Sequence, residues 1–239
     1  MKTFTKTMTA AALVAASATA VALEDISGSV NLASDYVFRG VSQTNNKAAI
    51  QGSLDWGYDF EPVRWYMGAW GSNIQADFFA SKPLMELDVY TGISGEFDDF
   101  GYDVGWLRYV YPGGSINDTT EWHAGGSWKW FGATYYYSRD WFATDDSASR
   151  IEGTFDYDLP YEIGLSLSVA NNYGDGNDDI WNDSYVDYSI GVSKTWLGAD
   201  WGLTFTDTDI GNNACKKVAT NGKDDICDGT FVVSLGKSF

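Results

Sequence analysis

Basic residues are scarce in this sequence. Its 239 residues include 33 aspartates and glutamates but only 15 lysines and arginines, which gives a formal net charge of −18. A chain this acidic lacks the positive surface that holds nucleic-acid phosphates. The composition therefore argues against nucleic acid as a partner.

Cysteine, histidine and proline are also rare. The two cysteines are Cys215 and Cys227, and His123 is the single histidine. Because no other Cys or His stands near the two cysteines, a loop disulfide is expected there in preference to a metal pair. No cofactor is expected. All four prolines fall in turns or loops of the arrangement predicted below, where no strand hydrogen bond is lost: Pro62, Pro83, Pro112 and Pro160.

Only the start of the chain contains a long apolar run. Two lysines precede an Ala- and Thr-rich stretch that ends at Ala20-Val21-Ala22, just before two acidic residues. This order predicts a secretory signal peptide over residues 1–22. A transmembrane helix is the alternative, but the run is too short for one and no basic residues follow it. Its removal leaves residues 23–239 with a net charge of about −20.

After Ser27 the dominant pattern is alternation of apolar and polar residues, with no sustained helical periodicity. Apolar residues occupy every second position between Ile50 and Phe60, and the pattern recurs in 85–97, 151–159 and 186–192. The runs are about ten residues long, the length that a strand tilted by about 45° needs to cross a bilayer. Alternation over that length predicts membrane-spanning strands.

Short turns and longer polar loops follow one another along the chain. The short turns are predicted near 60–63, 97–101, 130–132, 159–161 and 196–200, and the loops near 42–47, 73–83, 112–119, 142–149, 171–184 and 207–229. This punctuation implies about twelve strands, with both termini on the short-turn side. The predicted fold class for residues 23–239 is therefore all-β: an antiparallel up-and-down transmembrane β-barrel of the Gram-negative outer membrane.

Aromatic residues and the chain end agree with a barrel. The last strand places Phe231, Val233, Leu235 and Phe239 on one face, and its terminal aromatic resembles the signal read by the barrel-assembly machinery; Lys237 departs from that pattern. We expect this machinery, outer-membrane lipid and lipopolysaccharide as partners. A periplasmic aromatic girdle is predicted beside the short turns: Phe60, Trp65, Phe97, Tyr102, Trp130, Tyr157, Tyr161, Trp196 and Trp201.

A secreted β-sandwich is the alternative fold, because its strands also alternate. Sandwich strands are typically five or six residues long. The longer strands, the alternating connection lengths and the C-terminal phenylalanine all favour the barrel.

The segment DYVFRGVSQT, residues 35–44, places an arginine among aromatic residues. Read as a strand, it turns Tyr36 and Phe38 outward and Arg39 inward, among carboxylates that can pair with a guanidinium. Such a pair either fixes strand register in a network that plugs the barrel or forms a charged constriction. Because acidic residues dominate the inward face, a channel should prefer cations. The predicted pore-lining residues are Arg39, Asp55, Glu86, Asp88, Arg150 and Glu152.

The same segment carries a family resemblance. DYVFRGVSQT, followed by AAIQGS at 48–53 and YMGAWGS at 66–72, resembles the proteobacterial family of TorF-type porins. The resemblance extends loosely to Phe239 and implies an outer-membrane barrel with a transport role. It implies no substrate and no functional residues beyond the match at Tyr36, Phe38, Arg39 and Gly40.

Enzyme and metal interpretations have weaker support. His123 has Ser115 and Ser127 as its nearest serines in sequence, but no nucleophile motif is present. An ordinary inward-facing histidine is the simpler interpretation. The loop at 171–179 offers Asp175, Asn177 and Asp179 as oxygen ligands in an incomplete calcium pattern, so a solvated acidic loop is expected in preference to a metal site.

Three functions remain open at this point. The preferred one is a porin-like outer-membrane channel for passive diffusion of small solutes or ions. The second is a closed structural or adhesive barrel that acts through its extracellular loops. The third, a barrel enzyme that uses His123, has the least support.

Overall fold

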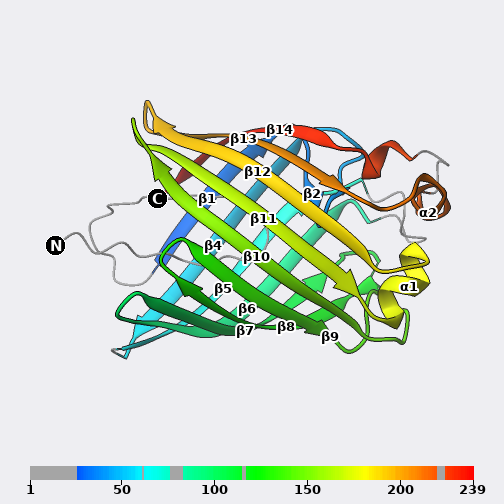
Figure 1. The fold of residues 1–239 in the computed structure, drawn as a ribbon, viewed down its shortest axis with the longest axis horizontal. Coiled ribbons are helices and arrows are strands. Elements are labelled where there is room, and N and C mark those ends of the chain that lie inside the picture. The colour runs from blue at the N-terminus through cyan, green and yellow to red at the C-terminus, as the bar shows by residue number, and fades with distance from the viewer. Residues whose placement is uncertain (1–25, 61, 76–82, 115–116, 220–223) are drawn as a thin grey trace.

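The alternating segments form a closed antiparallel β-barrel (Figure 1). The computed structural model describes residues 26–60, 62–75, 83–114, 117–219 and 224–239. The strands pair in chain order, and the ring closes where the first strand pairs with the last. The predicted all-β fold, an antiparallel up-and-down β-barrel, is therefore confirmed. The proposed signal peptide at 1–22 lies outside the described residues and stays a prediction.

Twelve strands make up the barrel wall. Most are ten or more residues long, as expected from the length of the alternating runs. They are β1 (Ile26–Ala33), β4 (Ala49–Asp59), β5 (Val63–Asn73), β6 (Met85–Phe97), β7 (Phe100–Val110), β8 (Thr119–Trp128), β9 (Phe131–Ser138), β10 (Ala148–Leu159), β11 (Ile163–Tyr173), β12 (Tyr185–Trp196), β13 (Ala199–Thr208) and β14 (Thr230–Ser238).

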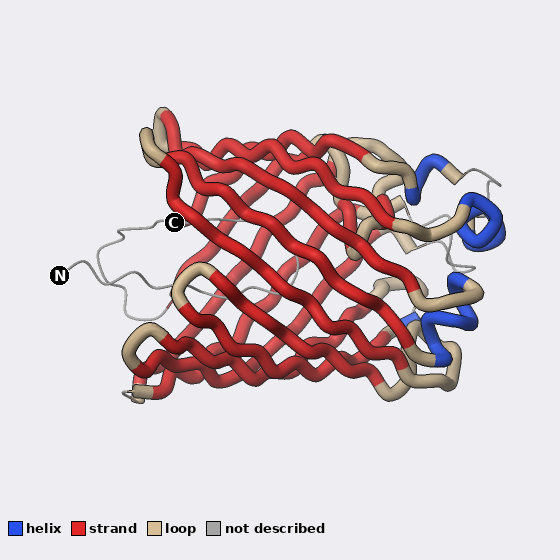
Figure 2. The backbone as a smooth tube through the Cα atoms, in the orientation of Figure 1, coloured by secondary structure: helices blue, strands red, loops and turns tan. Residues whose placement is uncertain are grey.

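Short turns and long loops lie at opposite ends of the barrel, as predicted. The C-terminus lies at the short-turn end (Figure 1), while the helices gather at the long-loop end (Figure 2). These helices are α1 (Asp175–Trp181), α2 (Asn212–Val218) and the 3₁₀ turn Asp225–Cys227. No helix in the described part of the chain is long and apolar enough to span a membrane.

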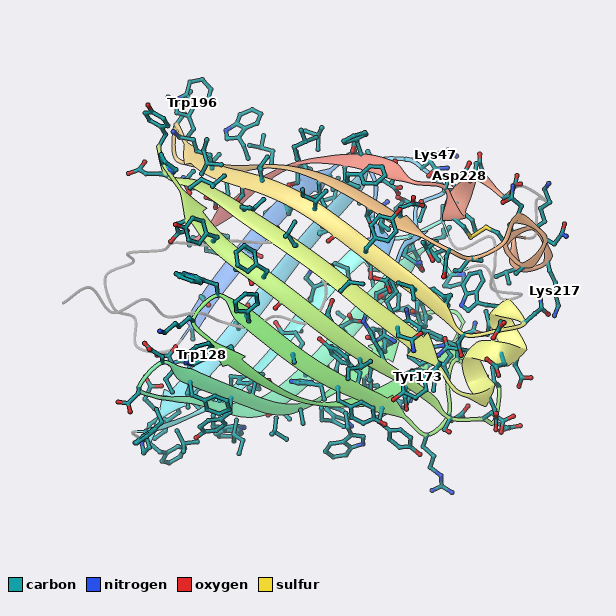
Figure 3. All side chains as sticks on the ribbon, in the orientation of Figure 1. Lys47, Trp128, Tyr173, Trp196, Lys217 and Asp228 are labelled. Carbon is teal, nitrogen blue, oxygen red and sulfur yellow. A yellow bond between two sulfur atoms is a disulfide. The ribbon has the colours of Figure 1, made fainter. Side chains whose placement is uncertain are left out.

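Large apolar side chains cover the outside of the barrel. Trp128 and Trp196 lie at the short-turn end (Figure 3), and both are exposed. Phe97 and Tyr161, also beside short turns, have exposed fractions of 75% and 83%. Exposing these apolar surfaces to water would cost free energy, whereas aromatic rings are favoured at the edge of a bilayer. The aromatic residues beside the short turns therefore have the arrangement of a membrane girdle.

One predicted strand is wrong. Residues 35–44 do not belong to the wall but form a small hairpin of β2 (Val37–Phe38) and β3 (Val41–Ser42), which we call the inserted hairpin. The reason is local: Arg39 and Gly40 both have left-handed backbones, with φ of 51° and 82°. Two successive positive φ values produce the tight turn that reverses a two-residue hairpin. The first long loop is consequently longer than the predicted 42–47, running from the end of β1 to the start of β4.

Candidate functional site: a constriction inside the barrel

The base of the inserted hairpin is held by Asp35. Its Oδ1 accepts a hydrogen bond from Ser42 Oγ at 2.7 Å and lies 2.6 Å from Thr44 Oγ1. The backbone N–H of Tyr36 donates to the same Thr44 hydroxyl at 3.0 Å. Asp35 is buried, and this burial raises the pKa of its carboxyl although the hydroxyl groups oppose the shift.

The hairpin packs on the inner wall formed by β5, β6 and β7. The Tyr36 hydroxyl donates to Glu86 Oε1 at 3.0 Å, and its ring meets Trp70 edge-on at 5.2 Å. The Phe38 ring lies 5.6 Å from that of Tyr109. Burial and the negative Glu86 raise the pKa of Tyr36 well above its usual value, so the phenol stays a proton donor. Tyr36 and Phe38 were predicted to face lipid; they instead face the barrel interior, because the whole segment folds inward.

Arg39 reaches across to β8. Its Nη2 lies 2.6 Å from Glu121 Oε2, with both side chains buried. The guanidinium carbon lies 4.8 Å from the ring centres of Phe38 and Trp141, and 5.6 Å from that of Tyr136. Burial lowers the pKa of the Arg39 guanidinium, but Glu121 together with Tyr109 and Tyr185 raises it by more, so the pKa lies above its usual value. The prediction that Arg39 lies inside among carboxylates is confirmed. Arg39 reaches the interior from the inserted hairpin, however, and not from a strand of the barrel wall.

The tip of the hairpin touches the opposite wall. A Cβ added to Gly40 would lie 2.7 Å from Thr208 Cβ and 3.1 Å from Asp187 Cβ, on β13 and β12. In the order of strands around the barrel, these two lie opposite β6. The inserted hairpin therefore crosses the barrel interior from wall to wall.

A second ion-pair network lies on the far wall. Arg150 on β10 makes a bidentate pair with Asp187 on β12, one contact being 3.1 Å, and also bonds Glu152 at 3.0 Å. Asn172 on β11 lies between them: it accepts from Arg150 at 3.0 Å and donates to Asp187 at 2.7 Å. We call these residues the Arg150 network. A buried guanidinium needs this many partners, since an unpaired one is strongly destabilising.

The short-turn half of the interior has a different polar arrangement. Asp55 accepts from the Tyr90 hydroxyl, and Asp103 is bonded to both His123 and the Tyr66 hydroxyl, the latter at 3.0 Å. Tyr66 has room because its neighbour on β6 is a glycine: a Cβ on Gly92 would clash with the Tyr66 hydroxyl.

His123 is an inward-facing residue, as the simpler interpretation had it. Its ring nitrogen Nε2 bonds Asp103, and the Tyr66 hydroxyl lies 3.4 Å away. Among the hydrogen bonds of the described residues, none joins His123 to a serine. Ser115, one of the two serines considered, lies outside the described residues.

The disulfide joins α2 to the 3₁₀ turn Asp225–Cys227 at the long-loop end of the barrel, and we call these two elements the cap. Cys215 and Cys227 are bonded, as predicted. Both cysteines belong to a buried cluster with Val41 of the inserted hairpin and Tyr185 of β12. Asn46 Nδ2 also donates to the Asp225 carbonyl at 3.1 Å. The cap thus rests on the loop that carries the hairpin.

The region of the weak metal candidate is helical. Asp175, Asn177 and Asp179 lie in α1, so the expected solvated loop is wrong for these residues. Asn177 is buried and donates to the Tyr173 carbonyl at 3.1 Å. Among the described residues, no group of three or more His, Cys, Asp or Glu side chains is arranged to hold a metal ion.

The six predicted pore-lining residues do not form one cluster. Glu86 and Asp88 lie beneath the hairpin, Arg150 and Glu152 belong to the network on the far wall, and Asp55 lies toward the short turns. Glu121 and Asp187, the main partners of the two arginines, were not among the six. Alternation marks both as inward, but sequence offers no signal for which cation each one meets. Trp141, in the loop after β9, could not be assigned to the interior at all.

Comparisons with known proteins agree with this architecture. Residues 17–239 match the model of a family described as a bacterial protein of unknown function (Gcw_chp). A search of curated proteins by sequence finds no match. Among solved structures, the NanC porin is similar with a TM-score of 0.56 and 11% identity, over 88% of this chain and 97% of that one.

The KdgM porin is similar as well. Its TM-score is 0.53 at 10% identity, over 89% of this chain and 99% of the porin. A structure of the KdgM porin in complex with disordered oligogalacturonate gives 0.50 at 10% identity, over 90% and 99%. At such low identity these matches establish a shared barrel fold.

Proposed function

Since the chain belongs to the Gcw_chp family of bacterial proteins of unknown function, we propose on the basis of its barrel that it is a porin-like outer-membrane channel of the TorF type. The channel serves passive diffusion of small solutes and prefers cations. The observation that carries the proposal is the division of the wall into an apolar outside and a charged inside. A wall that is apolar outside and charged inside suits a barrel that encloses an aqueous path. The fold shared with the KdgM and NanC porins agrees with it.

The preference for cations rests on the sign of the interior charges. Carboxylates on the inward faces outnumber basic groups, and rings of acidic side chains select cations. The acidic set is Asp55, Asp59, Glu86, Asp88, Glu96, Asp103, Glu121, Glu152, Asp156, Asp158, Asp187 and Asp200, against Arg39, Arg64 and Arg150.

The inserted hairpin is the proposed constriction. It crosses the interior, and wall residues at its level are buried: Glu86, Glu121 and Asp187 have exposed fractions of 2%, 4% and 5%. The hairpin therefore sets the width of the passage, and its two anchors, Glu121 and the β12–β13 wall, set its position.

The location and the partners follow from the same proposal. An outer-membrane barrel contacts lipid and lipopolysaccharide, with the long loops outward. The Phe239 side chain is 67% exposed, and its backbone exchanges hydrogen bonds with Gly28 where β14 meets β1. That position suits a terminal aromatic that is read by the assembly machinery.

A closed structural barrel is the second candidate, and one observation favours it. The long-loop half of the interior is packed with buried side chains, including Asn172 at 0% and Arg150 at 5% exposure. If this packing is permanent, the long loops are the working surface. An enzyme that uses His123 is the third; lipid hydrolysis by the purified protein that is abolished in His123→Ala would establish it.

Planar-bilayer recording decides between the first two candidates. The refolded protein, checked by the change in its gel mobility on boiling, is inserted into a bilayer under a salt gradient. Discrete current steps with a cation-selective reversal potential support the channel. Silence from folded, inserted protein rejects it in favour of the closed barrel.

A further inference from the structure

Asp88 differs from the other carboxylates of the barrel wall. It is 5% exposed, and its Oδ1 is fully buried and accepts no hydrogen bond from any described residue. Among the described barrel strands, no other side chain has a buried polar atom in this condition. A buried carboxylate oxygen normally has a partner, because leaving one unpaired is costly. This oxygen therefore points to a ligand.

Aromatic rings flank Asp88 on both neighbouring strands. It pairs with Trp70 of β5 on one side and Tyr109 of β7 on the other, all facing inward. The rings of the inserted hairpin pack against these two, Tyr36 on Trp70 and Phe38 on Tyr109. Aromatic faces attract cations, and the attraction is stronger away from water.

The side chains around Asp88 are mostly acidic. Glu86 lies two residues earlier on the same inward face of β6. Arg39 pairs with Glu121, whereas no ion pair among the described residues joins Glu86 or Asp88 to a basic side chain. One arginine therefore stands against three carboxylates.

Arg39 shows which chemical group such surroundings hold. Its guanidinium lies against the Glu121 carboxylate and between the rings of Phe38 and Trp141, both at 4.8 Å. Asp88 has the same two elements, a carboxylate and flanking rings, a short distance along the wall. The site around Asp88 thus repeats the chemistry that already binds one guanidinium.

We propose that Asp88, with Glu86 and the rings of Trp70 and Tyr109, forms a binding site for small organic cations of the guanidinium type. A cationic solute bonds to Asp88 Oδ1 and lies against the rings. Because Tyr36 and Phe38 pack on those rings, a solute reaches Asp88 only when the inserted hairpin moves. The inference deepens the proposed function, on which it rests, by naming the class of solute that the channel recognises.

Calorimetric titration of the folded, detergent-solubilised protein with ethylguanidinium chloride tests the site, with potassium chloride at equal ionic strength as the reference. We expect saturable binding to the unmodified protein. Asp88→Asn keeps the shape and removes the charge, and it should weaken binding about tenfold or more, since a hydrogen bond to a charged group contributes about 1.5–3 kcal/mol. Glu96→Gln, on the same strand and the same inward face but exposed near the short turn, should bind like the unmodified protein.

Several outcomes would overturn the site. The first is the absence of saturable binding to the unmodified protein. The second is binding by Asp88→Asn as tight as binding by the unmodified protein. If Asp88→Asn does not fold, Trp70→Leu is titrated instead; it removes one ring, so undiminished binding rejects the site.

Bilayer recordings in potassium chloride on the same preparations separate this inference from the channel proposal. Conductance without ethylguanidinium binding would reject the binding site at Asp88 and leave the channel proposal standing. Binding without conductance would reject the channel proposal and leave the binding site standing.

Discussion

Arg39 and Glu121, 82 residues apart in the chain, meet inside the barrel with Nη2 and Oε2 at 2.6 Å. This pair ties the tip of the inserted hairpin to β8. The rings of Phe38, Tyr136 and Trp141 exclude water from it. The position of the hairpin in the interior depends on this contact more than on any other ion pair, because Arg39 forms the hairpin's only ion pair among the described residues.

Arg39→Met should destabilise the protein by about 3–5 kcal/mol, because it leaves Glu121 buried without its partner. Urea unfolding in lipid vesicles measures the free energy. Arg39→Met combined with Glu121→Leu removes both charges and should recover most of the loss. A double variant as unstable as the single one would show that the pair is not what holds the hairpin.

Gly40→Ala should displace the hairpin tip. The new Cβ meets Thr208 Cβ at 2.7 Å, in addition to the strain of a residue other than glycine at φ +82°. Gly113→Ala is the matched control, because Gly113 has φ +84° but nothing within 4 Å of the added Cβ. Single-channel current should rise in Gly40→Ala and not in Gly113→Ala. Equal effects of the two substitutions would mean that backbone strain, and not the contact with Thr208, causes the change in current.

Neutralising Asp55, Glu86 and Asp88 together, by Asn, Gln and Asn, should reduce the preference for cations. The reversal potential under a salt gradient should move toward zero, because interior carboxylates set the sign of the field. Asp98→Asn, Asp99→Asn and Glu162→Gln form the control, with the same change in net charge in exposed short turns. An unchanged potential in the interior triple variant would remove these residues from the solute path.

Replacing both cysteines by alanine should loosen the cap. A disulfide that closes a loop of about this size typically contributes about 3 kcal/mol by restricting the unfolded chain. We expect protease to cleave the 209–229 region faster while the barrel keeps its heat-dependent gel mobility. Equal cleavage rates in both proteins would mean that the buried cluster around Val41 and Tyr185 holds the cap without the disulfide.

The stability of the hairpin should depend on pH through Asp35, whose pKa burial raises above the usual value of 3.8. The folded state then holds its proton more tightly than the unfolded state does. Asp35 therefore contributes full stability below pH 3.8 and loses it as the pH rises through the raised pKa. Asp35→Asn should flatten this fall, as measured by urea unfolding at several pH values from 3.5 upward. A fall of equal size in Asp35→Asn would assign it to other groups.

The wall of the barrel could be predicted from the sequence because each strand satisfies a local rule. Alternation sets which side chains face outward, and short turns set where strands end, so the register of pairs such as Leu54 with Ala69 follows from neighbours in the chain. The same rule of alternation gave a wrong prediction for the inserted hairpin. Tyr36 and Phe38 alternate as outward residues would, and the Arg39-Gly40 turn was the local signal against a continuous strand.

The candidate site was less predictable, because its contacts join distant segments. Arg39 was correctly expected inside, since a guanidinium among carboxylates is stabilised there. Its partner Glu121 and the ring of Trp141 come from β8 and from the loop after β9. Only the folding of two loops toward the interior brings them together, and no spacing along the chain encodes that.

The hairpin can be tested most directly by removing it. A variant in which residues 35–47 are replaced by a short Gly-Ser linker keeps β1 paired with β4, and its single-channel current is compared with that of the unmodified protein in the same bilayer. We expect a larger, cation-selective current in the variant, because the hairpin narrows the path. Equal currents, or silence from both folded proteins, would contradict it.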